Sequence, residues 1–230
     1  MSIAADPVLH RIARFWDARG REDARRYSVP GGLPTDEAAF AASGEALVDA
    51  LGGLVGWTPD PADTVIEVGC GAGRISGALA GRVAQVVAYD ISRTMLAAAR
   101  DRLPQLANVA WRHGHAGDLE AEPEGAADAV LLIGVLTHLP EPEDLVLALE
   151  QAARAIVPGG VVLFDLRLVF DPLRLPGEDP VPPHVARHPI WQGRPSELET
   201  VAAIAQQAGL EIERIAGSET GRCLVLTRRL

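Results

Sequence analysis

The sequence predicts an α/β protein with a sheet of seven strands, mostly parallel with a final antiparallel strand, and helices on both faces. Three observations predict this class. From Thr64 onward, short β-rich runs alternate with helical patterns. A glycine-rich turn, VIEVGCGAGR at 65–74, joins the first predicted strand to a helix. The second predicted strand ends in the acidic residue Asp90, where a parallel sheet presents ligand-binding groups.

The predicted elements follow one another at short spacing, as in a single domain of 230 residues. The strands are predicted at 64–68, 86–90, 109–112, 129–133, 160–166, 211–216 and 222–228. Helical periodicity covers 74–82, 93–103, 143–156 and 196–209. The last two strands flank the short polar stretch GSETG, so we expect them to pair antiparallel.

Two regions stand outside this alternation. Residues 1–60 contain helical patterns at 7–26 and 35–54, separated by the breaker SVPGGLP, and are predicted to form a helical lid. Residues 61–230 then form the ligand-binding domain. Within it, 167–194 is rich in Pro and His and lacks periodicity, which predicts a long loop that binds substrate.

Composition excludes several classes of protein. The formal net charge of −10 would repel a phosphate backbone, so no nucleic-acid partner is expected. No apolar run reaches the length that crosses a bilayer, and the opening residues lack a signal peptide's apolar region, so we expect a cytoplasmic protein without a membrane partner. Cys70 and Cys223 lie far apart and fit neither a disulfide framework nor a metal site. Because every basic residue is Arg, a Schiff-base or phosphate-loop lysine is excluded.

The glycine-rich turn limits the ligand. Gly69, Gly71 and Gly73 allow a sharp turn and a close approach of the backbone to a ligand. In the dinucleotide fingerprint a further glycine would fall at position 74, which is Arg74 here. Glu67 before the turn disfavours a pyrophosphate and suits a cationic amine. These features argue against a nicotinamide oxidoreductase and predict a ligand without phosphate.

Asp90 follows Gly73 by 17 residues, at the end of the second strand. A carboxylate in this position can accept hydrogen bonds from both hydroxyls of a ribose. Ile91 and Met95 follow it and can offer an apolar surface to an adenine, although Met95 is equally compatible with a place in the core. The sequence therefore predicts a nucleoside site.

Together these motifs resemble the class I S-adenosylmethionine-dependent methyltransferases, which have a Rossmann-like fold. The resemblance rests on E-x-G-x-G-x-G after the first strand, Asp90 after the second, ADAVLLIGVLTHLP around the fourth, and VPGGVVLF entering the fifth. It spans 61–230, and segments such as FWDARGREDARRY and WQGR are similar to one bacterial subgroup of the family. The resemblance implies S-adenosylmethionine as cofactor and methyl transfer as activity.

The resemblance also implies the cofactor-binding residues. They are Glu67, Gly69, Cys70, Gly71, Gly73, Asp90, Ile91, Met95, His115, Ala116 and Gly134. Many relatives have an Asp after the third strand that bonds the adenine amino group. The best register puts His115 there, with the Ala116 N–H completing the edge, and the alternative register puts Asp118 there. A neutral imidazole can accept from the amino group.

The acceptor side is less defined by sequence. His138 follows the fourth strand at the edge where ligands bind, so it is the candidate proton acceptor, with His184 and His188 as alternatives. No metal is expected. The segment IGVLTHLP lacks the motifs of nucleic-acid methyltransferases of this fold, which favours a small-molecule acceptor. An S-adenosylmethionine-binding protein that transfers no methyl group would share the same cofactor motifs and remains the alternative.

Overall fold

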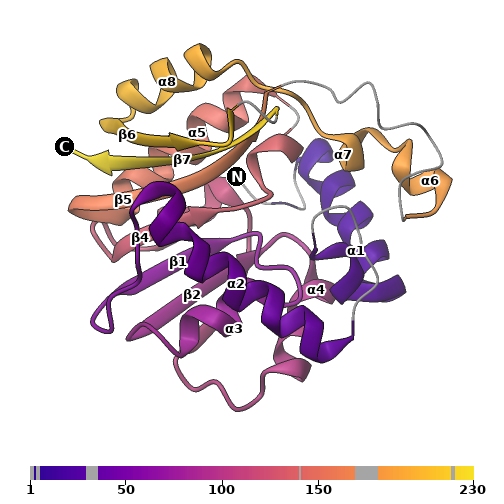
Figure 1. Cartoon of the computed structure of the whole chain (residues 1–230). Coiled ribbons are helices and arrows are strands. Elements are labelled where there is room, and N and C mark those ends of the chain that lie inside the picture. Colours follow the sequence, from indigo (N-terminus) through magenta and orange to yellow (C-terminus); the bar gives the residue numbers. More distant parts are fainter. Residues whose placement is uncertain (1–2, 4–5, 30–35, 140, 169–180, 219–220) are drawn as a thin grey trace.

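The computed structural model describes residues 3, 6–29, 36–139, 141–168, 181–218 and 221–230. Its centre is one seven-stranded sheet of order β3-β2-β1-β4-β5-β7-β6 (Figure 1). The strands are β1 (Thr64–Val68), β2 (Gln85–Asp90), β3 (Val109–His113), β4 (Ala127–Leu132), β5 (Ile156–Arg167), β6 (Leu210–Ala216) and β7 (Arg222–Arg229). The first five pair in parallel, and β7 runs antiparallel to both β5 and β6. The predicted fold class is confirmed.

Helices cover both faces of this sheet. They are α1 (Pro7–Tyr27), α2 (Glu37–Val55), α3 (Arg74–Ala80), α4 (Arg93–Arg102), α5 (Pro142–Ala155), α6 (Pro183–Ala186), α7 (Pro189–Gln192) and α8 (Leu198–Gln207), with 3₁₀ turns η2 (Ala116–Ala121) and η3 (Leu136–His138). Alternate residues of a strand point to opposite faces. In β1, Val65 packs into the cluster shared with α2 and α3, whereas Ile66 packs into the cluster shared with α5 and α8.

The order of the strands fixes where a ligand can bind. From β1 the chain moves outward through β2 and β3, and it then returns to place β4 on the other side of β1. The carboxyl ends of β1, β2 and β4 therefore meet at one edge, at the point where the direction of the strand order reverses. Open α/β sheets bind their ligands in the crevice at this point.

The structure differs from the sequence prediction at two places, the start of β5 and the segment 183–192. β5 begins at Ile156, where a helix was expected to end, because Ile156 already pairs with Ala127 ahead of a register shift. The expectation of a loop without periodicity is wrong for 183–192, which forms α6 and α7. Each begins at a proline, whose fixed φ suits the first turn of a helix. Residues 169–180 of the predicted substrate loop lie outside the described residues.

The two N-terminal helices lie close to their predicted bounds. α1 packs along α4 and is kinked at Asp23, whose backbone is extended (φ −165°). α2 crosses the outside of α3 (Figure 1). A small apolar cluster joins α1, α2 and α6 to Ala72 of the glycine-rich turn and Met95 of α4. The N-terminal helices are therefore packed against the sheet edge that could bind a ligand.

One expectation from composition needs correction. α2 is long and apolar enough to cross a membrane, by length and composition alone, with a mean hydropathy of 1.4 over 18 residues. The apolar character comes from Ala together with Leu, Val and Phe. Leu51 and three other apolar residues of α2 are buried against the domain, and Arg82 pairs with Glu45 and Asp49 on the helix. These contacts hold α2 on the sheet domain.

Candidate cofactor and acceptor site

The glycine-rich turn leaves β1 through a tight backbone loop. The N–H groups of Gly69 and Cys70 both donate to the carbonyl of Tyr89 in β2, at 2.8 and 2.9 Å. Gly71 has φ +54°, and a Cβ there would lie 2.4 Å from the Ser28 hydroxyl oxygen. Other residues rarely adopt this conformation, so glycine is required by both backbone and space. The turn is thus packed between β2 and Ser28 at the end of α1.

Asp90 lies at the end of β2 directly beside this turn. Its Oδ2 accepts from the Gly71 N–H and its Oδ1 from the Ser92 N–H, both at 2.8 Å. The side chain is buried, and burial raises the pKa of Asp90 to about 6 although the two N–H groups favour the charged form. An ionised carboxylate has about four acceptor positions. Two therefore remain for hydroxyl groups of a ligand.

Glu67, in β1, points to α3. Its carboxylate accepts a hydrogen bond from the Ser76 hydroxyl, and only 2% of the residue is exposed. Burial raises the pKa of Glu67 to about 7, although the Ser76 hydroxyl and the charge of Arg74 oppose the shift. The carboxyl group therefore anchors the first turn of α3, immediately after the glycine-rich turn.

The residues predicted for an adenine lie around the start of α4 and η2. Ile91 is half-buried, whereas Met95 is buried in the cluster with α1. His115 and Asp118 form one capping box, in which the His115 N–H donates to Asp118 Oδ2 at 3.0 Å. His115 Nδ1 accepts from the Gly117 N–H at 3.1 Å. The acceptor nitrogen of the imidazole is therefore engaged within the chain, while 27% of the Asp118 side chain is exposed.

The end of β4 faces the glycine-rich turn. A Cβ on Gly69 would lie 2.5 Å from a methyl carbon of Val135, so the two segments are in contact. The neighbouring Gly134 is exposed, has φ +74°, and a Cβ there would meet nothing within 4 Å. Its N–H donates to Asp165 Oδ1 at 2.6 Å. Open space therefore adjoins the backbone of Gly134 at the carboxyl edge of the sheet.

His138 ends η3 near this edge. Its Nδ1 lies 2.7 Å from the carbonyl oxygen of Ile190. Because a carbonyl only accepts, Nδ1 carries the proton and Nε2 keeps a free lone pair in the neutral ring. Burial, aided by the charges of Arg167 and Arg222, lowers the pKa of His138 to about 4. The imidazole is thus neutral at pH 7 and can accept a proton.

His138 lies at one end of a series of aromatic contacts. Trp16 of α1 meets the imidazole edge-on, with ring centroids 5.3 Å apart. Trp191 of α7 lies 6.1 Å from Trp16 and 5.7 Å from Tyr27. His188 stacks on Phe15 at 4.3 Å, whereas His184 is exposed on α6. Of the three candidate histidines, His138 alone combines a fixed tautomer with a place at the end of β4.

Sequence analysis missed the residues that fasten the N-terminal helices to the glycine-rich turn. The Ser28 hydroxyl accepts from the Ala72 N–H at 2.8 Å. Arg74, which stands where the dinucleotide fingerprint has glycine, donates to the carbonyls of Ser28 and Ser43 at 3.1 and 3.2 Å. No sequence signal pointed to these bonds, because Ser28 and Arg74 are 46 residues apart.

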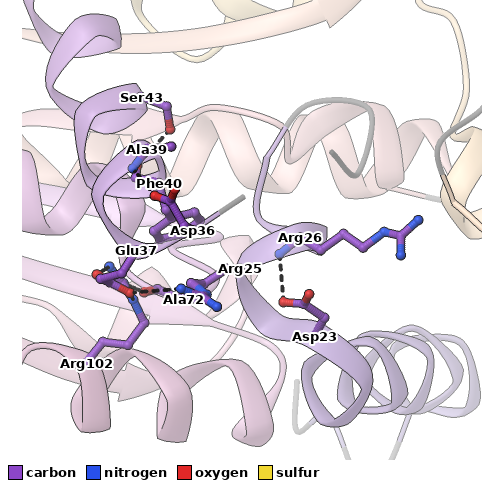
Figure 2. A network of polar contacts seen from close by, with 10 residues as sticks. All are labelled: Asp23, Arg25, Arg26, Asp36, Glu37, Ala39, Phe40, Ser43, Ala72 and Arg102. Atoms are coloured by element: carbon purple, nitrogen blue, oxygen red, sulfur yellow. Dashed lines mark hydrogen bonds and ion pairs between the residues drawn. The ribbon is translucent and has the colours of Figure 1, made fainter. Parts of the chain in front are cut away.

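Arg102 of α4 makes a second connection between the N-terminal helices and the glycine-rich turn, drawn in Figure 2. It donates to the Ala72 carbonyl and forms an ion pair with Glu37 at the start of α2. Its guanidinium also lies over the ring of Phe40, 4.4 Å from the centroid. Arg25 of α1 approaches the same Glu37 at 3.6 Å. The turn, α1, α2 and α4 are therefore joined through one network.

Comparison with known proteins decides the family. The family model described as "Methyltransferase domain" matches residues 65–160, which contain the glycine-rich turn, Asp90 and His138. The chain belongs to the class I S-adenosylmethionine-dependent methyltransferases. The methyltransferase family resemblance is thereby confirmed, and S-adenosylmethionine is the cofactor of this family.

Curated relatives match part of the length of this chain. A ubiquinone biosynthesis O-methyltransferase from Alkalilimnicola ehrlichii is 34% identical over 119 residues, 51% of this chain and 44% of the relative. The one from Aromatoleum aromaticum is 31% identical over 160 residues, 66% of each chain. The chain thus spans less than half the length of the first of these relatives.

Solved structures share the fold at low sequence identity. N-methyltransferase NodS from Bradyrhizobium japonicum, in complex with S-adenosylhomocysteine, has a TM-score of 0.64 at 17% identity and covers 95% of this chain and 98% of its own. Magnesium protoporphyrin IX methyltransferase from Synechocystis, also with bound S-adenosylhomocysteine, has a TM-score of 0.65 at 17% identity and covers 96% and 99%. The [4+2]-cyclase SpnF has a TM-score of 0.61 at 18% identity and covers 80% of each chain.

Proposed function

We propose that this protein transfers the methyl group of S-adenosylmethionine to a small-molecule acceptor. The observation on which the proposal rests is the hydrogen bond between the Gly71 N–H and Asp90. This bond joins the glycine-rich turn to Asp90 at the end of β2, beside the open space at Gly134. When bound, the cofactor supplies an activated methyl group whose sulfur leaves without needing a proton.

The donor set of the site fits this cofactor. Asp90 retains acceptor positions for the two ribose hydroxyls. The backbone of Gly69–Gly73 and Gly134 would hold the methionine part, because the glycines at 69, 71, 73 and 134 carry no side chain. Ile91 and Met95 would support the adenine, and the Ala116 N–H its edge. Because His115 Nδ1 is engaged by Gly117, Asp118 is the better proposed acceptor for the adenine amino group.

His138 is the proposed proton acceptor. Its Nδ1–H is fixed by the Ile190 carbonyl, so Nε2 can take a proton from the acceptor hydroxyl or amine as the new bond forms. The aromatic residues around it exclude water and can align the acceptor with the methyl group. A neutral imidazole of low basicity suits an acceptor whose own proton is acidic. The net charge of −10 supports a small molecule rather than a nucleic acid.

We propose that the helices α1 and α2 of residues 1–60 and the described part of the substrate segment, residues 181–194, close over this acceptor. Support comes from the contact of Trp16 with His138 and of Trp191 with Trp16. The partners of Trp16 in these contacts, His138 and Trp191, lie in η3 and α7. The arrangement can admit an acceptor only if α1 and α7 separate, as lids do.

A second candidate is an S-adenosylmethionine-binding protein that catalyses another reaction. The fold is shared by a structure described as a [4+2]-cyclase, so the fold does not separate the two functions. Transfer of isotope from methyl-labelled S-adenosylmethionine to any acceptor separates them. Labelled product from a panel of phenols, amines and acids establishes methyl transfer, and turnover of an acceptor without label supports the second candidate.

The test of the cofactor site is titration calorimetry. S-adenosylmethionine and S-adenosylhomocysteine should bind with micromolar affinity, and NAD should not bind. Asp90→Ala removes the acceptor of two hydrogen bonds of about 1.5 kcal/mol each, so affinity should fall about 100-fold. Absence of binding to wild-type protein shown by circular dichroism to be folded would overturn the proposal.

A further inference from the structure

Asp17 of α1 reaches the start of α4. Its Oδ1 accepts from the Ser92 hydroxyl at 2.8 Å and from the Thr94 N–H at 3.2 Å. The Thr94 hydroxyl donates in turn to the Asp17 carbonyl at 2.9 Å. Burial alone would raise the pKa of Asp17, but the bonds from Ser92 and Thr94 outweigh it and hold the pKa below its ordinary value. The carboxylate is therefore ionised at neutral pH and bound through Oδ1.

Ser92 connects this contact to Asp90. It is buried, and its N–H donates to Asp90 Oδ1 at 2.8 Å. Its hydroxyl oxygen also accepts from the Met95 N–H at 3.1 Å, so it caps α4. Because the hydroxyl has a single proton, donating it to Asp17 leaves the oxygen free to accept from Met95. Asp17 thus holds the side chain of Ser92, and the backbone N–H of Ser92 holds Asp90 Oδ1.

The approach of α1 to α4 at this point is unusually close. A Cβ on Gly20, one turn after Asp17, would lie 2.3 Å from the Thr94 hydroxyl oxygen and 3.0 Å from the Met95 nitrogen. Glycine inside a helix costs about 1 kcal/mol relative to alanine. The close contact between α1 and α4 that Gly20 permits offsets this cost.

The residue before Asp17 faces the other half of the site. Trp16 packs edge-on against His138, 5.3 Å between ring centroids. Consecutive residues of α1 therefore contact the strand ends proposed to hold the cofactor and the acceptor. A shift of α1 would disturb both contacts together.

We propose that Asp17 is a positioning residue for the cofactor, which through Ser92 holds the Asp90 carboxylate in the orientation that binds the ribose. The proposal rests on the proposed function, because it assigns Asp90 to the cofactor. It makes the N-terminal helix a determinant of cofactor affinity in addition to a cover for the acceptor. A merely structural Asp17 would affect the stability of α4 without changing affinity in the folded protein.

Titration calorimetry with S-adenosylhomocysteine tests this without an acceptor. Asp17→Ala should weaken binding about tenfold, the value of one charge-assisted hydrogen bond. Asp17→Asn keeps one acceptor oxygen and should lose less. Asp101→Asn makes the same change of charge on the exposed side of α4 and should leave affinity unchanged. Affinity of folded Asp17→Ala within twofold of the wild type would overturn the inference.

Two further comparisons guard against a folding defect. Gly20→Ala forces the Thr94 hydroxyl away and should also weaken S-adenosylhomocysteine binding, whereas Gly53→Ala, in a helix with open space around it, should not. In a double-mutant cycle, Asp17→Ala should cost little more once Ser92→Ala is present, because the two act in series. Full additivity would overturn the inference. Failure of the wild type to bind S-adenosylhomocysteine would instead overturn the proposed function.

Discussion

Gly71 donates its backbone N–H to Asp90 Oδ2 across 2.8 Å, so residues 19 positions apart in the chain form one edge of the site. The bond brings a buried carboxylate against a turn whose glycines have positive φ. A buried carboxylate lowers stability on its own, and the positive φ values restrict these positions of the turn to glycine. Their combination at the carboxyl edge of the sheet is the strongest geometric support for a cofactor site, and it sets the first variants to test.

Glu67→Gln should remove a pH-dependent loss of stability. Burial raises the pKa of Glu67 from 4.5 to about 7, so between these values the folded protein keeps a proton that the unfolded chain has released. The free energy of unfolding therefore falls as pH rises through this window, by about 3 kcal/mol for this group. Urea titrations at pH 5 and pH 8 should show a smaller difference for the variant. Asp90 contributes in the same direction below about pH 6 and remains in both proteins.

Gly134→Ala should distinguish an effect on cofactor affinity from an effect of backbone strain on stability. Gly134 and Gly56 both have positive φ, at +74° and +78°, and a Cβ on either would meet nothing within 4 Å. Alanine should therefore cost each fold about 1 kcal/mol, measured as a similar fall in Tm. At Gly134 alone the methyl group would enter the space proposed for the cofactor and weaken S-adenosylhomocysteine binding at least tenfold. Equal affinities of the two variants would contradict the assignment of Gly134.

His138→Ala should reduce turnover by about 100-fold or more and leave S-adenosylhomocysteine binding unchanged. The reason is the Nδ1–H bond to Ile190, which leaves Nε2 as the free base beside Trp16. His184→Ala, on the exposed surface of α6, is the matched control and should keep full activity. A loss below fivefold for His138→Ala would exclude it as proton acceptor and favour His188, which stacks on Phe15.

Deletion of residues 1–30 should abolish turnover while the sheet stays folded. It removes α1, and with it Trp16, Asp17 and the Ser28 hydroxyl that binds the Ala72 N–H. The sheet keeps its own two apolar clusters, neither of which includes a residue of α1. Circular dichroism and thermal unfolding should therefore show a folded domain. Retained methyl transfer would show that α1 is no part of the active site.

Much of the fold was predictable because local pattern and global fold agree. β1 was predicted at its observed bounds, since a short β-branched run ends in a glycine-rich turn. Prediction failed where tertiary pairing overrides a local pattern, as at Ile156, which pairs with Ala127 despite following a helical period. It also failed for α6 and α7, whose four residues each are too few to show a period.

The candidate site, like the fold, was predictable from the sequence only in part. Asp90 and the three glycines were predicted as cofactor residues from motif spacing, and the structure brings Asp90 against the turn because the ends of neighbouring parallel strands meet at one edge. The sequence favoured His115 over Asp118 as the residue at the adenine. In the structure both residues belong to one capping box, in which His115 Nδ1 accepts from the Gly117 N–H.

By itself, the sequence determined the class of fold, the family and the residues at the strand ends, because these follow from periodicity, turn chemistry and spacing along one chain. Only the tertiary structure decided that Asp17 and Ser28 contact the cofactor side, that Arg74 binds the N-terminal segment, and that Trp16 faces His138. These contacts join residues dozens of positions apart, and they depend on the angle at which α1 packs on α4. Packing geometry of that kind leaves no periodic trace in a sequence.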